Sequence, residues 1–368
     1  MGQHFSKVLL LFCILTFQLN CSQKKTKTFC RHRSPVLGIK IFDQNRVLSF
    51  CAKEFLLWDI KQRQSENVII GMESLQDNVH LEDVEKVNEN NIASICTNGV
   101  VKLWNMQKGE NSKLEIEEGK LCNAGNINKL DEKTIFVHNR GIFSLFDIAA
   151  QKFLTKFGKK YEPAKQREKK NSYCKLSPNE LLSLHRCKIY LWDVRKQKKA
   201  HKFWEYEGDK HHLPVRNIYK IDENTFVATD ELNSIKLWDT RKKECMQTFL
   251  GHENPIKKII NLNEKKMVST SCDKIVVWNK KTGNNRYIKT KVKLVEKLDN
   301  KKMLYAQQDG SIKILDTKNL EEGEKSENIL TGLIGKYKND VPIFCVHQKK
   351  NILSANTEKI YIDDLSET

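Results

Sequence analysis

Apolar and polar residues alternate with a period of two in a segment that returns several times along the chain. Its clearest copy is Ile235-Lys236-Leu237-Trp238-Asp239, in which Ile235 and Leu237 would lie on one side of a β-strand and Lys236 and Trp238 on the other. Because large apolar side chains occupy both sides, the strand needs cover on both faces. The pattern therefore predicts a strand inside a larger all-β body.

The repeated segment has eight copies, and five of them end in Trp followed by Asp or Asn. These ten positions are Trp58, Asp59, Trp104, Asn105, Trp192, Asp193, Trp238, Asp239, Trp278 and Asn279. Weaker copies end at Asp147, Asp316 and Asp364. Successive copies are about 44 residues apart, a period typical of sheets repeated around an axis.

The spacing and the Trp-Asp endings resemble WD40 repeats over residues 26–365. The resemblance implies an all-β fold, a WD40-type β-propeller with one four-stranded blade per repeat. Eight repeated strands favour eight blades, and seven is the alternative if the weak third or eighth copy is misread. We expect one propeller domain at 26–365, preceded by a separate segment at 1–22.

The two ends of the repeat region are each incomplete in a way that the other end can repair. Thr28 to Val36 aligns with Thr248 to Ile256, which follows a Trp-Asp strand where the outermost strand of a blade is expected. No blade precedes the first of these stretches, and the last blade has no residues left for its own outer strand. We therefore predict that residues of about 26–30 complete the sheet begun by residues of about 341–365, which closes the ring and removes two open edges.

The first 22 residues carry the features of a targeting segment. Val8–Leu19 is a mostly apolar run behind Lys7, too short to span a bilayer but long enough for the core of an export signal. Cys21 follows closely and resembles the acylated cysteine of a lipoprotein, while Gly2 and Ser6 fit a myristoylation pattern. We expect export or membrane association, with a cytoplasmic, uncleaved N-terminus as the alternative. The intact mass of the natural protein decides between them.

Composition bounds the partners and the chemistry more than the fold. The net charge of +18 favours acidic partners, and the eleven scattered cysteines form no CxxC pair. No metal, cofactor or catalytic residue is therefore predicted. The cysteines indicate buried thiols rather than a disulfide framework, which is more typical of a reducing compartment and conflicts with export.

The WD40 resemblance also implies a buried polar network in blade six. Gly251-His252, Ser269, Asp273 and Trp278 match the positions at which the family links indole, hydroxyl, imidazole and carboxylate. We expect Trp278 to bond Ser269, Ser269 to bond His252, and His252 to bond Asp273. The same residue types form hydrolase triads, but here their spacing follows the blade repeat, which favours a structural role.

The function expected from this sequence is that of a non-catalytic protein-protein interaction scaffold, whose specificity lies in loops. A propeller enzyme with acid and base groups at the channel mouth is the first alternative. The second is a binder of acidic partners or nucleic acid through basic residues around Lys156–Lys170 and the following blade, beside Trp204 and Tyr206. Other proteins are the expected partners, and nucleic acid is disfavoured.

Overall fold

The structure is a computed structural model of the whole chain. It describes residues 27–32, 34–59, 64–71, 79–106, 110–114, 125–139, 142–158, 173–185, 188–203, 215–307, 311–317, 331–336, 343–347, 351–355 and 359–364. The segment at 1–22 with Cys21 therefore lies outside the described residues, and the targeting features stay a prediction. No helix among the described residues is long and apolar enough to cross a membrane.

Every regular element in the described part of the chain is a strand. In chain order these are β1 (Lys27–Arg31), β2 (Val36–Ile41), β3 (Arg46–Cys51), β4 (Glu54–Asp59), β5 (Gln64–Gly71), β6 (Leu81–Lys86), β7 (Asn91–Cys96), β8 (Val101–Asn105), β9 (Glu110–Leu114), β10 (Asn126–Lys129), β11 (Thr134–Asn139), β12 (Ile142–Asp147), β13 (Lys152–Gly158), β14 (Tyr173–Ser177), β15 (Glu180–His185), β16 (Lys188–Asp193), β17 (Lys198–Phe203), β18 (Asn217–Lys220), β19 (Thr225–Thr229), β20 (Ile235–Asp239), β21 (Glu244–Phe249), β22 (Lys258–Asn261), β23 (Lys266–Thr270), β24 (Lys274–Asn279), β25 (Asn285–Lys289), β26 (Val292–Lys297), β27 (Lys302–Gln307), β28 (Ser311–Asp316), β29 (Thr331–Lys336), β30 (Ile343–His347), β31 (Asn351–Ala355) and β32 (Lys359–Asp364).

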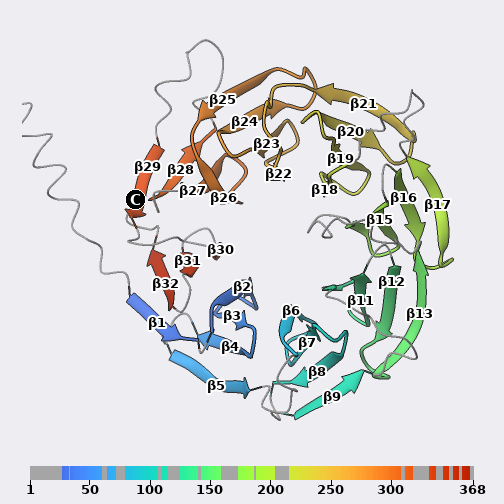
Figure 1. Cartoon of the computed structure of the whole chain (residues 1–368), viewed down its shortest axis with the longest axis vertical. Helices are drawn as coiled ribbons and strands as arrows, with labels where there is room; N and C mark the ends of the chain where they lie inside the picture. The colour runs from blue at the N-terminus through green and yellow to red at the C-terminus, as the bar shows by residue number, and fades with distance from the viewer. Residues whose placement is uncertain are drawn as a thin grey trace, which may run out of the picture.

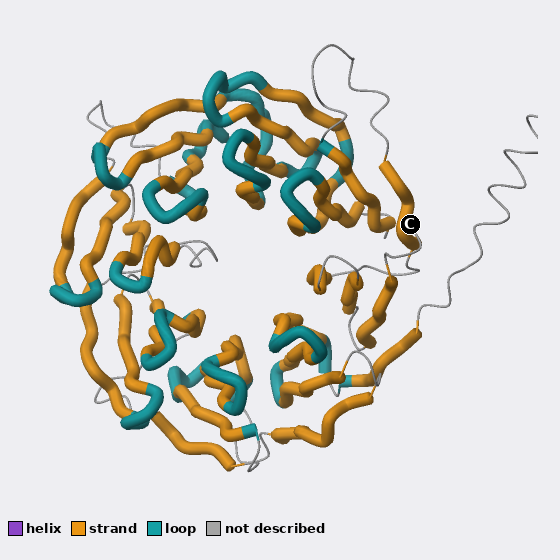
Figure 2. The backbone as a smooth tube through the Cα atoms, turned by 180° about the vertical axis from the view of Figure 1, so that it is seen from behind, coloured by secondary structure: helices purple, strands orange, loops and turns teal. Residues whose placement is uncertain are grey.

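These strands form eight four-stranded antiparallel sheets within the described residues. The sheets stand side by side around a central axis (Figures 1 and 2). In seven of them the first strand in chain order is innermost and the fourth lies at the rim, while in the eighth β30 is innermost and β1 lies at the rim. We number them as blades one to eight from the sheet β2-β3-β4-β5 onward. The all-β propeller expected from the repeat is therefore the architecture of this chain.

Blade eight contains strands from both ends of the described chain. Its strand order is β1-β32-β31-β30, and β1 pairs antiparallel with β32 through Lys27 with Ile362 and Thr28 with Tyr361. Figure 1 shows β1 lying alongside β32 at the rim of the ring. The predicted ring closure is thus confirmed, and the outer strand that the last repeat lacks comes from the start of the propeller.

The core lies between neighbouring sheets, because each blade presents apolar side chains to the blade on either side. Between blades five and six, Val227 and Leu237 pack with Ile259, Met267 and Trp278, all of them buried. This is the two-sided burial that the alternating strand pattern requires. Packing between neighbouring blades therefore stabilises each blade in addition to its own strand pairing.

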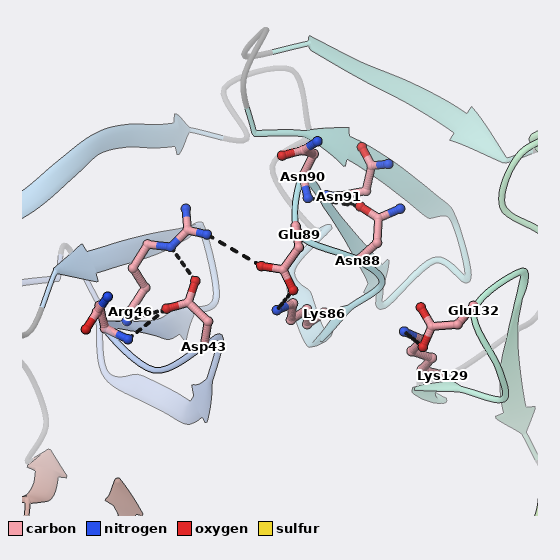
Figure 3. Close-up of polar contacts among 10 residues, drawn as sticks. Asp43, Arg46, Lys86, Asn88, Glu89, Asn90, Asn91, Lys129 and Glu132 are labelled. Carbon is pink, nitrogen blue, oxygen red and sulfur yellow. Dashed lines mark hydrogen bonds and ion pairs between the residues drawn. The ribbon is translucent and has the colours of Figure 1, made fainter. Parts of the chain in front are cut away.

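Turn chemistry repeats around the ring on one face of the molecule. We call this the first-turn face: it carries the turns between the first and second and between the third and fourth strands of each blade. In blade one, Asp43 Oδ1 accepts hydrogen bonds from the backbone N–H groups of Asn45 and Arg46 at 2.8 and 2.9 Å. Asn88 makes the same turn in blade two (Figure 3). The opposite, second-turn face carries the turns between second and third strands and the connections between blades.

Candidate interaction surfaces

Four of the five repeated tryptophans are held by a serine on the neighbouring strand. The indole N–H donates to the serine Oγ in four pairs: Trp58 to Ser49 at 2.8 Å, Trp104 to Ser94 at 2.8 Å, Trp192 to Ser183 at 2.8 Å and Trp278 to Ser269 at 2.7 Å. In blade five, Ala228 takes the serine position, and Trp238 instead stacks on Phe226 with ring centroids 6.3 Å apart. The tryptophans therefore fix strand register within blades rather than form a binding site.

The residue after each tryptophan shapes the turn that leaves the third strand. Asp193, Asp239 and Asn279 each accept a backbone N–H through Oδ1, from Lys196, Arg241 and Lys281 respectively. Asp59 and Asn105 occupy the same position in blades one and two. This explains why the repeat accepts Asn in place of Asp, since both carry the acceptor oxygen.

Blade six contains the indole, hydroxyl and imidazole of the expected network in contact. Ser269 Oγ accepts from Trp278 and lies 2.6 Å from His252 Nε2, so the serine hydrogen donates to that nitrogen. Gly251 precedes the histidine because a Cβ there would lie 2.8 Å from the Trp278 ring. Burial, with Lys274 nearby, lowers the pKa of His252 to about 4, so the imidazole is neutral at pH 7.

The fourth member of that network is placed differently from the expectation. Asp273 Oδ1 accepts from Ser271 Oγ at 2.6 Å, and His252 Nδ1 has no hydrogen-bond partner among the described atoms. The hydrogen bond from Ser271 is the main cause that lowers the pKa of Asp273. Asp273 therefore bonds Ser271 of its own turn, and a hydrogen bond from Asn254 also lowers its pKa, whereas the predicted bond from His252 to Asp273 is not formed.

This geometry predicts unequal costs for two substitutions in blade six. Ser269→Ala leaves the buried indole of Trp278 and Nε2 of His252 without a partner, so we expect a loss of about 2–4 kcal/mol in unfolding free energy. Asp273→Ala removes a contact near the surface and is expected to cost about 1 kcal/mol or less. Urea denaturation of the two variants measures both values; a larger cost for Asp273→Ala would contradict this assignment.

Blade one contains a more complete network that the sequence pattern did not reveal. His32 Nε2 lies 2.7 Å from Ser49 Oγ, and His32 Nδ1 lies 3.2 Å from Glu54 Oε1. The missed signal was the alignment of His32 with His252, together with an acid one residue later than in blade six. His32, Cys51 and Glu54 also bring potential metal ligands within 4.8 Å, but Ser49 and Glu54 already occupy both ring nitrogens of His32.

Buried histidines with lowered pKa values lie in different blades rather than at one channel mouth. His138 of blade three lies on β11 and contacts the rings of Phe143 and Tyr173, and burial lowers its pKa to about 3. His252 lies in blade six and His32 at the start of blade one. Among the described residues, these imidazoles do not converge with a carboxylate at one surface site.

The second-turn face carries two prominent apolar side chains. Leu250 is 71% exposed and Leu232 is 67% exposed, on the connection between blades five and six and on the β19–β20 turn. Asn233 Nδ2 donates to the carbonyl oxygen of Glu253 at 3.0 Å, which ties the two segments together. Arg216 and Glu231 form an ion pair of 3.6 Å beside them. The two leucines therefore lie on neighbouring segments of this face with charged residues beside them, and we call this region the Leu232–Leu250 patch.

The first-turn face is electrically uneven around the ring. Over blades one to three, three basic side chains of this face are paired with acids: Arg46 with Asp43 at 2.6 Å, Lys86 with Glu89 at 2.8 Å and Lys129 with Glu132 at 2.7 Å (Figure 3). Over blades five to seven, the same face contains a pocket of about 660 Å³. Its lining residues are Asp222, Asn261, Asn263, Glu264, Lys265, Lys266, Lys280, Lys297, Asn300, Lys301 and Thr317.

The basic region named from the sequence is only partly visible. The stretch from residue 159 to 172 and residues 204–214, with Trp204 and Tyr206, lie outside the described residues. The described part of blade four places Lys198 and Lys199 on its exposed outer strand β17. The basic pocket over blades five to seven was not anticipated, because its lysines come from separate repeats.

Comparison with known proteins identifies similar folds among solved structures but no match to a protein-family model or to a curated protein sequence. No protein-family model matches the chain, and no curated protein matches it significantly. Among solved structures, the C-terminal WD40 domain of Sif2 superposes with a TM-score of 0.69 and 12% sequence identity, over 92% of this chain and 98% of that one. The fold is that of a WD40-type propeller.

A second solved structure gives the same result for this WD40-type propeller. The computationally designed protein Ika8 superposes with a TM-score of 0.67 and 17% identity, over 90% of this chain and 97% of that one. At such identities the likeness concerns the arrangement of the sheets and not their surfaces. The surfaces of this chain therefore have to be interpreted from its own residues.

Proposed function

We propose that this WD40-type propeller is a non-catalytic platform that binds another protein through the Leu232–Leu250 patch. The fold supports this role, because a ring of sheets presents turns from successive blades on one rigid face. The observation that carries the proposal is the pair of leucines. They are the two most exposed large apolar side chains among the residues that the structure describes.

The arrangement of the two exposed leucines is what indicates an interface. A single exposed apolar side chain is ordinary on a protein surface. Two on adjoining turns, joined by the bond from Asn233 to Glu253 and flanked by the ion pair of Arg216 with Glu231, form an apolar centre with a polar rim. Protein interfaces commonly have this organisation. The net charge of +18 favours a partner with an acidic surface.

The double variant Leu232→Glu and Leu250→Glu tests the proposal. Two buried carboxylates at the centre of an interface would lack partners, so we expect loss of binding by a factor of about 100 or more. The measurement is capture from an extract of the natural source, followed by titration of the purified captured protein.

Met246→Glu is the matched control, because Met246 is 49% exposed on the outer strand β21 of the same blade. It introduces the same kind of charge away from the patch and should leave capture unchanged. Equal capture by the wild type and the double variant would contradict the proposal, as would equal loss in the Met246→Glu control.

A further inference from the structure

The pocket on the first-turn face lies where two residues depart from the repeat. The first departure concerns the residue near the end of each innermost strand that pairs with the second residue of the neighbouring strand. This position, which we call the exit position, holds Ile41 and Val346 in blades one and eight, and in the other six blades it holds Lys86, Lys129, Lys175, Lys220, Asn261 and Lys297. Blade six alone among these has the shorter asparagine.

The exit-position side chains of blades four to seven bond the preceding blade. Lys175 donates to the carbonyl oxygen of Leu130 at 2.5 Å, and Lys220 donates to that of Leu176. Lys297 reaches the carbonyl of Leu262 at 2.5 Å. In blade six, Asn261 Nδ2 makes the equivalent bond to Ile221 at 2.6 Å. The asparagine preserves the link between blades while leaving out most of a lysine side chain, and the pocket lies beside it.

The second departure puts a cation beside that space. In six blades, the residue two positions after the repeated tryptophan, or after Phe146 or Leu315 in its place, donates its backbone N–H to the first turn of its own blade. These donor residues are Met106, Ile148, Val194, Thr240, Lys280 and Thr317. Only blade six has a charged side chain there. Lys280 Nζ points to Asn261, donating to its Oδ1 at 3.1 Å. The two departures therefore meet at one place in the pocket.

Three of the five lysines of the pocket donate to neutral oxygens. Lys280 donates to an amide oxygen, Lys297 to the carbonyls of Asn261 and Leu262, and Lys266 to the carbonyl of Thr317. Such contacts position an ammonium group without cancelling its charge. Burial, together with Lys297, lowers the pKa of Lys280 although Asp222 and Glu264 act in the opposite direction.

The two acids of the pocket do not balance its lysines. Five lysines line it against Asp222 and Glu264. The Asp222 carboxylate is engaged by its own turn, accepting from the backbone N–H groups of Asn224 and Thr225 at 2.8 Å each and from Thr225 Oγ1 at 2.7 Å. The pocket is therefore a cationic depression in the first-turn face, whereas Arg46, Lys86 and Lys129 of blades one to three are paired with acids.

We propose that this pocket binds a compact, soluble anion that carries adjacent phosphate groups. Its size is in the range of small-molecule sites. The cations that line the pocket are lysines, whose ammonium groups act as point charges and bind phosphate oxygens without requiring a flat, two-oxygen ligand. The site is independent of the Leu232–Leu250 patch, which lies on the opposite face.

Calorimetric titration of the full chain with inorganic tripolyphosphate tests the site, with citrate as a carboxylate of comparable charge. We expect saturable binding of one tripolyphosphate and binding of citrate weaker by about tenfold or more. Absence of saturable binding, or equal affinity for citrate, would overturn the proposal. The proposal that the ligand is a soluble anion also predicts that tripolyphosphate binds more tightly than vesicles that carry a bisphosphorylated inositol lipid. A higher affinity for the vesicles would overturn that part of the proposal.

Asn261→Lys is the decisive variant, because it introduces the residue of blades two, three, four, five and seven. It adds a positive charge, yet its side chain should fill the pocket and weaken tripolyphosphate binding about tenfold or more. A merely electrostatic attraction to a basic protein predicts the reverse. Unchanged or tighter binding by a folded Asn261→Lys protein would therefore overturn the proposal.

Lys265→Gln and Lys133→Gln provide a matched pair that does not depend on filling the pocket. Both lysines are exposed and occupy the same position in the first turn, in blades six and three respectively, but only Lys265 lines the pocket. Lys265→Gln should weaken binding several-fold and Lys133→Gln should not. Equal effects of the two substitutions would assign binding to the general charge of the protein and would contradict the site.

Discussion

Removal of residues 1–33 is expected to lower the melting temperature by roughly 5–15 °C, since it deletes β1 and His32 together. Without β1, blade eight loses its outer strand, and β32 exposes a row of unpaired backbone groups at the rim. The network of His32 with Ser49 and Glu54 is lost as well, which leaves buried polar groups in blade one. Thermal unfolding followed by circular dichroism gives the melting temperature.

Two matched variants separate the contributions to this loss. Truncation at residue 26 retains β1 and should leave the melting temperature within a few degrees of that of the full chain. His32→Ala retains β1 but removes the imidazole, so it measures the network alone. If removal of residues 1–33 changed stability no more than His32→Ala does, the pairing of β1 with β32 would contribute nothing to holding the ring closed.

Acid should destabilise the propeller through His138. The histidine is 3% exposed on β11, and burial lowers its pKa from 6.5 to about 3. The unfolded chain therefore binds a proton below pH 6.5 that the folded chain binds only near pH 3. Stability is complete above pH 6.5 and falls as the pH decreases toward 3, by on the order of 3–5 kcal/mol in total.

His138→Phe tests this proton linkage. Phe50 occupies the same register position in blade one, where it pairs with Phe55 as His138 pairs with Phe143. A phenyl ring is therefore already accommodated at this register position in another blade. Urea unfolding between pH 7 and pH 4 should give a shallower decline for the variant than for the wild type. Parallel declines would show that His138 does not control the acid response.

The architecture could be predicted from the sequence because it depends on many repeated small signals. Alternating strands, the spacing of Trp238 and its equivalents, and the similarity of the stretch at Thr28 to that at Thr248 all point to one closed ring. These signals reinforce one another, since a shift by one residue in any strand would turn its apolar side chains out of the core. Ring closure followed from the edge that would otherwise be left open.

The surfaces could not be predicted in the same way. The contact of Asp273 depends on whether a turn brings the carboxylate to Ser271 or to His252, and spacing along the chain does not distinguish the two. The pocket combines Asn261 and Lys280 of one blade with Lys297 of the next. None of these residues stands out in a lysine-rich sequence. Only superposition of the repeats shows that Asn261 and Lys280 differ from the residues at the same positions of the neighbouring blades.

The pairing of β1 with β32 also has a consequence for synthesis of the protein. More than three hundred residues separate the two partners, so the first strand of the propeller to be made must wait for the last strand of the propeller to leave the ribosome. During that interval the growing arc has two unsatisfied rims, and a second nascent copy could supply the missing neighbour to either. Rapid completion of translation, or a chaperone that shields the waiting strand, would therefore favour a closed monomer over chains joined end to end.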